Sequence, residues 1–141
     1  MRKISLLILL VLLILGCAGV QTPTYEQLDK ADYGKFPENS KEIVTKYISS
    51  NLIDPYSAVF SGWQGPSKGW YADYWGKNIS FGYRVCVQVN AKNRMGGYTG
   101  QKLYFIFFRD GNIVAREGGD YRPGTMGEQR IYELCSGKYI K

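Results

Sequence analysis

The amino-acid sequence predicts an α+β fold: an antiparallel sheet of four or five strands, one main helix packed on it, and a short C-terminal helix. Three observations lead to this class. One segment repeats its apolar residues with a helical period, later segments repeat them at every second position, and turn residues separate these segments. The composition agrees, because 141 residues with 45% hydrophobic and 21% charged side chains suit one small globular unit.

Helical signals occur on both sides of the predicted sheet. Thr24 can cap a short helix over residues 25–31, and Ser40 can cap a longer one over residues 41–52. A third short helix is predicted over residues 128–135. The longer segment is the main helix, because its apolar residues fall on one helical face: Ile43, Val44, Tyr47, Ile48 and Leu52.

Strands are predicted from residue 57 onward, first as a short strand over residues 58–60. The strand over residues 81–90 carries its apolar side chains on one face, which leaves Cys86 on the other: Phe81, Tyr83, Val85, Val87 and Val89. Residues 103–108 are continuously apolar, which is typical of a central strand buried on both sides. Asp110-Gly111-Asn112 then predicts a hairpin into residues 113–116.

The N-terminal segment has the pattern of an export signal. Arg2 and Lys3 precede Leu6–Leu15, an unbroken run of ten apolar residues that ends at Gly16-Cys17. Ten helical residues rise about 15 Å, half of a hydrocarbon core of about 30 Å. We therefore expect residues 1–16 to be a cleaved signal peptide rather than a membrane span.

The end of this segment, Ile14-Leu15-Gly16-Cys17, resembles the lipobox of bacterial lipoproteins. The resemblance implies that the Cys17 thiol receives a diacylglycerol, that cleavage falls just before it, and that the new amine is acylated, for example with palmitate. Residues 17–24 would then be a lipidated tether and residues 25–141 a single periplasmic domain. Ala18 rather than Asp follows the cysteine, which favours the periplasmic face of the outer membrane. The alternative is an ordinary signal peptide with an incidental cysteine.

The remaining cysteines, Cys86 and Cys135, are an even pair in an oxidising compartment, and we expect a disulfide bond between them. The alternatives are two free buried thiols or a reactive thiol. The chain has no His, which removes His-based metal sites, Ser-His-Asp triads and Cys-His dyads. We expect no metal, no cofactor and no catalysis; the residual hydrolase candidates are Glu117 and Asp120.

Two loop-like stretches supply candidate binding residues. Residues 62–78 hold three tryptophans, and an exposed aromatic cluster suits recognition: Trp63, Trp70 and Trp75. The alternative is that residues 70–75 form an edge strand that fills the core. Residues 89–102 are rich in Asn and Gly, and the side chains that could meet an anionic or protein partner are Asn90, Lys92, Asn93, Arg94, Tyr98 and Lys102. The alternative here is an ordinary hairpin connection.

Several short motifs resemble those of small, uncharacterised proteobacterial and prophage lipoproteins. They span residues 31–108 and comprise Ala31-Asp32-Tyr33-Gly34 with Pro37, Asp54-Pro55-Tyr56-Ser57-Ala58, Cys86, Val89-Asn90-Ala91-Lys92-Asn93 and Gly96-Gly97-Tyr98-Thr99-Gly100. Val87 stands where that group usually has Gly. The resemblance supports an exported lipoprotein and implies no activity.

The expected function is a non-catalytic interaction or envelope-structural module. The net charge is +6, but charge alone selects no partner. We expect the membrane through the lipid anchor, together with an envelope protein or peptidoglycan, and no nucleic acid, because the compartment rarely offers it. The alternatives are a prophage-type exclusion or lytic-enzyme-inhibitor lipoprotein and a small cell-wall hydrolase.

Overall fold

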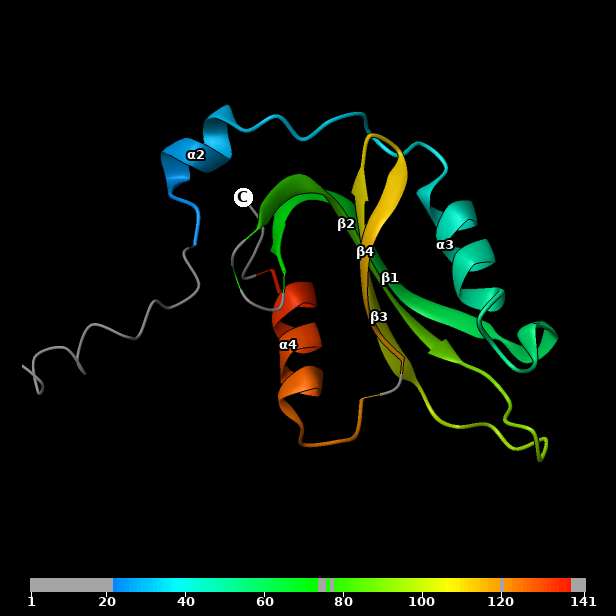
Figure 1. Ribbon diagram of the computed structural model, residues 1–141. Coiled ribbons are helices and arrows are strands. Elements are labelled where there is room, and N and C mark those ends of the chain that lie inside the picture. The colour runs from blue at the N-terminus through cyan, green and yellow to red at the C-terminus, as the bar shows by residue number, and fades with distance from the viewer. Residues whose placement is uncertain (1–21, 74–75, 77, 120, 138–141) are drawn as a thin grey trace, which may run out of the picture.

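The computed structural model describes residues 22–73, 76, 78–119 and 121–137, and it confirms the α+β prediction (Figure 1). Four strands form one antiparallel sheet in the order of the chain: β1 (Val59–Ala72), β2 (Ile79–Asn90), β3 (Lys102–Arg109) and β4 (Asn112–Gly118). Three helical elements precede the sheet and one follows it: α2 (Tyr25–Lys30), α3 (Ser40–Ser49), the 3-10 helix η1 (Pro55–Ser57) and α4 (Met126–Cys135).

The helix α3 packs on one face of the sheet, where Val44 and Ile48 are buried. The alternating face predicted for β2 is confirmed, because that strand lines this core together with two residues of β3: Tyr83, Val85, Val87, Val89, Ile106 and Phe108. The remaining apolar residues of the predicted helical face, Ile43, Tyr47 and Leu52, pack around its edge. The helix begins at Ser40, with Asn39 in the capping position, so the prediction that Ser40 is the cap is wrong by one residue.

The helix α4 packs on the opposite face, as the two sides of the sheet in Figure 1 show. Ile131 and Leu134 contact Phe105 and Phe107 of β3 in this second core. The predicted disulfide bond joins Cys86 of β2 to Cys135 at the end of α4. The buried Arg84 also reaches this end of the helix, donating a hydrogen bond to the Leu134 carbonyl at 2.8 Å. A cation there is favourable because helix carbonyls lack partners in the last turn.

The segment before α3 closes one end of the sheet. A capping box between Thr24 and Gln27 starts α2, as predicted, and Leu28 of this helix packs against Trp70. Arg109 of β3 donates hydrogen bonds to the Asp32 backbone carbonyl and to its carboxylate. These contacts fix the N-terminal segment across this end of the sheet, where it runs from α2 to α3 (Figure 1).

The strand β1 is much longer than predicted. A short strand over residues 58–60 and a loop over residues 62–78 were expected, yet β1 continues to Ala72. The glycine-rich part forms bulges, because the pairing with β2 shifts on either side of Gln64. Gly65 has a φ of 89°, and a Cβ atom there would collide with the Arg84 carbonyl. These glycines therefore mark close backbone approach inside a strand rather than a loop.

The signal peptide predicted over residues 1–16, the lipid-bearing Cys17 and most of the tether lie outside the described residues. Among the described helices, none is long and apolar enough to span a membrane.

Candidate binding site

The connection between β2 and β3 is built by its own hydrogen bonds. The Asn93 side-chain oxygen accepts from the amides of Met95 and Gly97, at 2.9 and 3.1 Å. The Thr99 amide donates to the Ala91 carbonyl at 3.1 Å. At the base of this loop, Lys92 pairs with Tyr98 and places its ammonium 5.5 Å from the centre of the Tyr98 ring. The alternative of a hairpin connection therefore holds for this segment, and its own hydrogen bonds define the shape of the loop.

A second set of contacts fastens this loop to η1. The Lys92 amide donates to the Ser57 hydroxyl at 2.9 Å. The Asp54 carboxylate accepts from the Ser57 amide at 3.2 Å and so caps η1. The Asp54 carboxylate is therefore engaged in capping η1.

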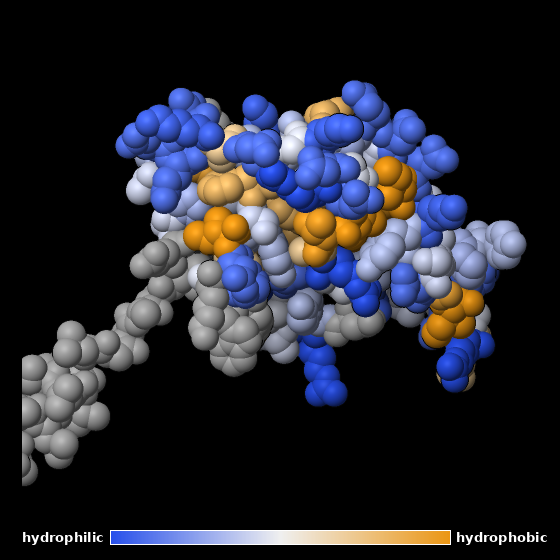
Figure 2. Space-filling model, turned by 45° about the horizontal axis from the view of Figure 1, so that its top comes forward, coloured by the Kyte–Doolittle hydropathy of each residue, from blue (hydrophilic) through white to orange (hydrophobic). Residues whose placement is uncertain are grey.

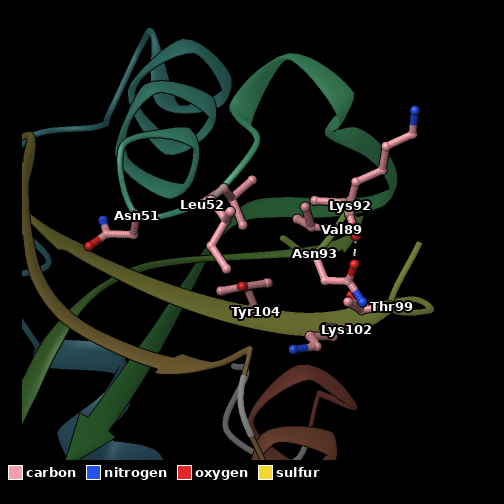
Figure 3. Close-up of a pocket in the computed structure, with 10 residues that line it drawn as sticks. Asn51, Leu52, Val89, Lys92, Asn93, Thr99, Lys102 and Tyr104 are labelled. Carbon is pink, nitrogen blue, oxygen red and sulfur yellow. Dashed lines mark hydrogen bonds between the residues drawn. The ribbon is translucent and has the colours of Figure 1, made fainter. Parts of the chain in front are cut away.

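A pocket of about 210 Å³ lies between the end of α3 and the β2–β3 loop (Figure 3). Its lining consists of Asn51, Leu52, Ile53, Val89, Ala91, Lys92, Asn93, Thr99, Lys102 and Tyr104. In Figure 3, Leu52 lies above Tyr104, Asn93 and Thr99 lie close together, and the ammonium of Lys92 points outward. Three predicted binding residues, Lys92, Asn93 and Lys102, thus meet in one pocket with residues that follow α3.

The pocket continues along α3 toward the edge of the sheet. A smaller pocket of about 50 Å³ shares Asn51 and Tyr104 with it and is further lined by Tyr47, Ile48, Arg116 and Gly118. The Arg116 guanidinium lies 5.9 Å from the centre of the Tyr47 ring. No aspartate or glutamate lines either pocket. The two pockets share part of their lining, and together they are lined by the cationic side chains Lys92, Lys102 and Arg116. We call this pair of adjoining pockets the α3 groove.

Exposed apolar side chains surround the wide end of the α3 groove. Ile53, Tyr56, Met95 and Tyr98 are among the exposed large hydrophobic residues, and Tyr56 and Met95 are 99% and 94% exposed. Figure 2 is turned about the horizontal axis from the view of Figure 1, so η1 and the β2–β3 loop lie at the right-hand end of the molecule in both figures. In Figure 2 a small hydrophobic group stands there beside strongly hydrophilic side chains. Such a mixed surface is typical of binding sites.

Not all of the predicted binding residues belong to this site. Arg94 is exposed near the tip of the loop and lines neither pocket. Asn90 is half-buried, and its side-chain oxygen is buried without a hydrogen-bond partner. Asn90 pairs with Val59, and it also lines neither pocket.

The tryptophan-rich stretch is not an exposed recognition surface where the structure describes it. Trp70 is only 5% exposed and packs against Leu28 and Ala72, so the prediction that it lies on a binding surface is wrong. The alternative of a core-filling edge strand holds for this residue, because β1 needs large side chains on its buried face. Trp63 is half-buried against the α3 core, where its ring stacks on Phe60. Trp75 lies outside the described residues.

The hydrolase candidate Glu117 has a structural environment. Its carboxylate accepts from Arg130 at 2.7 Å and from the Tyr71 hydroxyl at 3.0 Å, which links β4 to α4 and β1. Burial raises the pKa of Tyr71, and the charge of Glu117 raises it further. Burial lowers the pKa of Arg130, but the hydrogen bond and charge of Glu117 outweigh this and raise it overall. Asp120, the proposed second acid, lies outside the described residues.

Within the described ranges, no group of three or more His, Cys, Asp or Glu side chains could hold a metal ion. Comparison with protein-family models, with curated proteins and with solved structures finds no match. The function is therefore argued from the site itself.

Sequence reasoning missed the α3 side of the groove. Leu52 was assigned to the helix core and Tyr104 to a buried strand, and both also line the pocket. Asn51 gave no signal, because an Asn at the end of a helix usually serves the helix itself. Here too Asn51 serves the helix, since its side-chain amide donates a hydrogen bond to the Tyr47 carbonyl at 2.8 Å. A tyrosine, with its polar hydroxyl, within the otherwise apolar run of residues 103–108 was the one available sign.

Proposed function

We propose that this chain is a lipid-anchored binding module of the bacterial envelope, attached through Cys17 to the periplasmic face of the outer membrane. It recognises an envelope protein or peptidoglycan and catalyses no reaction of its own. The observation that carries the proposal is the placement of the α3 groove, whose wide end lies at the end of the domain opposite to α2, the helix nearest the anchor (Figure 1).

The tether length gives this placement its meaning. Residues 17–24 span at most about 28 Å when fully extended. They keep α2 near the bilayer, whereas η1 and the β2–β3 loop lie at the far end of the domain. A projection can shorten a distance but never lengthen it, so α2 and η1 are at least as far apart in space as they are in Figure 1. A groove at the far end is thus able to meet a partner beyond the lipid surface.

Two further features support an exported binding protein. The disulfide bond between Cys86 and Cys135 suits an oxidising compartment. The groove combines cationic, hydrogen-bonding and apolar side chains on a loop with its own hydrogen bonds, and binding sites commonly combine such groups. Glu117, the described member of the carboxylate pair, is held by Arg130, which favours binding over hydrolysis.

Site-specific photo-crosslinking in intact cells tests the proposal. A photoreactive residue at Met95, at the tip of the β2–β3 loop, should give a discrete adduct in the outer-membrane fraction. The matched control is Met126 at the start of α4, which is 79% exposed and lies on an element well apart from the tip of that loop in Figure 1. We expect no such adduct at Met126. Digestion with protease or with a cell-wall hydrolase then identifies the partner as protein or peptidoglycan.

The anchor is tested in the same cells with Cys17→Ser. This variant should leave the membrane fraction, and mass spectrometry should show that it has lost the acyl groups present on the natural chain. Adducts of equal yield at positions 95 and 126, or none at native expression, contradict the binding function. A natural chain found in the cytosol with residues 1–16 retained contradicts the anchor.

A further inference from the structure

A separate pocket of about 220 Å³ lies on the α4 face of the sheet. Its lining comes from the start of β3, from the segment between β4 and α4, and from α4 itself. It shares Thr99 and Lys102 with the larger pocket of the α3 groove and has eight lining residues of its own. We call it the α4 pocket.

Ring-bearing side chains are prominent in the lining of the α4 pocket. Tyr121 and Tyr132 line it together with Pro123, and the two tyrosines are 44% and 58% exposed. The start of α4 positions Tyr121, because a Cβ atom at Gly127 would collide with the Tyr121 ring. The Tyr121 hydroxyl also donates to the Glu117 carboxylate at 3.4 Å. The pocket therefore offers tyrosine rings, which combine a large apolar face with a polar tip.

The charges in this lining oppose each other. Among the described lining residues, Lys102 is the one cation and Glu128 the one carboxylate. Both are already engaged, since Lys102 has an interaction partner and Glu128 accepts from the Gly124 amide at 2.6 Å. A charged ligand would gain attraction from one side chain and repulsion from the other. A neutral ligand with hydroxyl or amide groups suits the site better, because Gln101 adds both a donor and an acceptor.

The same lining also has an aliphatic part. Leu103 is half-buried and Ile131 is 3% exposed, and both belong to the core under α4. Rings, neutral hydrogen-bonding groups and an aliphatic patch together match a pyranose sugar. Its C–H face packs on aromatic rings, its hydroxyls exchange hydrogen bonds, and an acetamido substituent adds a methyl group for the aliphatic patch.

The size of the α4 pocket agrees with one sugar ring. Its volume of about 220 Å³ lies below the roughly 300–1,000 Å³ typical of drug-sized ligands. A proline-rich peptide could also contact the tyrosine rings, but proline has no N–H to donate to the Glu128 carboxylate. Sugar hydroxyls supply such donors, and hydrogen bonds to a carboxylate are stronger than those between neutral groups.

We propose that the α4 pocket binds a neutral pyranose sugar that carries an acetamido group. Tyr121 and Tyr132 contact the C–H face of the ring. Gln101 and Glu128 exchange hydrogen bonds with its amide and hydroxyl groups, and the acetamido methyl packs against Leu103. The inference goes beyond the proposed function, because it assigns a second site to the chain, beside the α3 groove and with a ligand of its own.

The test uses the full acylated chain in micelles of a phosphocholine detergent, which has no sugar headgroup. N,N′-diacetylchitobiose is titrated in while NMR follows the backbone amide signals of residues 101–103 and 128–132. Cellobiose is the matched control, since it has the same linkage and lacks the acetamido groups. We expect saturable shifts with diacetylchitobiose and about tenfold weaker binding of cellobiose, because the methyl contact and an amide hydrogen bond are lost.

Variants assign the binding to the α4 pocket. Tyr132→Ala should weaken binding of diacetylchitobiose about tenfold, whereas Tyr132→Phe keeps the ring and should retain most of the affinity. Tyr25 is 90% exposed on α2 and lies outside the pocket, so Tyr25→Ala should leave binding unchanged. Amide signals remote from the pocket should stay in place in each variant, which verifies its fold.

Four outcomes overturn the proposal. They are the absence of saturable shifts at millimolar disaccharide, equal affinity for the two disaccharides, unchanged affinity in Tyr132→Ala, and equal shifts with a diproline peptide blocked at both ends, which would assign the pocket to a polypeptide. The crosslinking positions Met95 and Met126 are not part of the pocket lining. The sugar site and the proposed function are therefore measured independently, and either can fail while the other stands.

Discussion

The two faces of the sheet are covered by helices of ten residues each, but they are held by different forces. The α3 face is a continuous apolar core with aromatic and branched side chains from both layers. The α4 face has a smaller apolar cluster, to which the chain adds a disulfide bond, the Glu117–Arg130 ion pair and the Arg84 contact to the end of the helix.

This contrast teaches how a small domain keeps a helix that arrives late in the chain. The helix α3 buries an amphipathic stripe, so the hydrophobic effect is the main force that holds it. The helix α4 also buries an apolar stripe, namely Ile131, Leu134 and Cys135, but against a smaller apolar cluster. Its docking adds covalent and charged contacts at defined positions. Breaking one face should consequently look different from breaking the other.

Removal of the disulfide bond should have the largest effect. The double substitution Cys86→Ala and Cys135→Ala should lower the free energy of unfolding by about 4 kcal/mol, since the bond closes a long loop with a sequence separation of 49 residues. Hydrogen exchange should accelerate mainly in α4, while α3 keeps most of its protection. Denaturant unfolding measures the first effect. A variant as stable as the natural chain would show that packing alone holds α4.

Truncation on the other face should be slightly less costly and should act on the whole sheet. Ile48 is 2% exposed and contacts the β2 core, so Ile48→Ala should destabilise the chain by about 3 kcal/mol through lost burial and a cavity. The exposed α3 residue Lys46 provides the control, because Lys46→Ala should change stability by less than about 0.5 kcal/mol. Faster exchange confined to α3, with protection of β2 unchanged, would contradict a shared core.

The sequence revealed the α3 face more fully than the α4 face for the same physical reason. Strict alternation in β2 and a helical stripe in α3 are local patterns, and both appear in the fold as predicted. The docking of α4 was predictable only through Cys86. This cysteine lies on the second face of the sheet, so a disulfide bond to Cys135 requires the C-terminal segment to cover that face. The Glu117–Arg130 pair has no local signature, since it joins residues of different elements.

Strand β1 and the groove show where local reasoning stops. Gly62, Gly65 and Pro66 are ordinary turn residues in sequence, and only the paired strand β2 reveals that they form bulges. Lys92, Asn93 and Lys102, which the sequence placed among the candidate binding residues of one loop, line the larger pocket together. The other half of the groove required knowing that residues 51–53 lie against β3, which is a tertiary fact.

The smallest expected effect concerns the stability of the α4 face at alkaline pH. The Tyr71 hydroxyl donates to Glu117 on the α4 face, and burial together with the Glu117 charge raises the pKa of Tyr71 above its ordinary value. A raised pKa in the folded state means that the stabilisation is complete below the pKa of tyrosine in the unfolded chain, near 10. It is lost as the pH rises through the higher pKa of the folded state.

Tyr71→Phe should therefore cost about 1 kcal/mol near neutral pH, the value of one hydrogen bond, and its difference from the natural chain should shrink as the pH rises above about 10. Denaturant unfolding of both chains between pH 8 and 11 measures this. Tyr25 is 90% exposed, so Tyr25→Phe should leave the alkaline profile unchanged. Ile48→Ala on the α3 face removes no ionisable group, so it should keep the alkaline slope of the natural chain. A Tyr71→Phe difference that stayed constant with pH would place the hydroxyl outside the charged network.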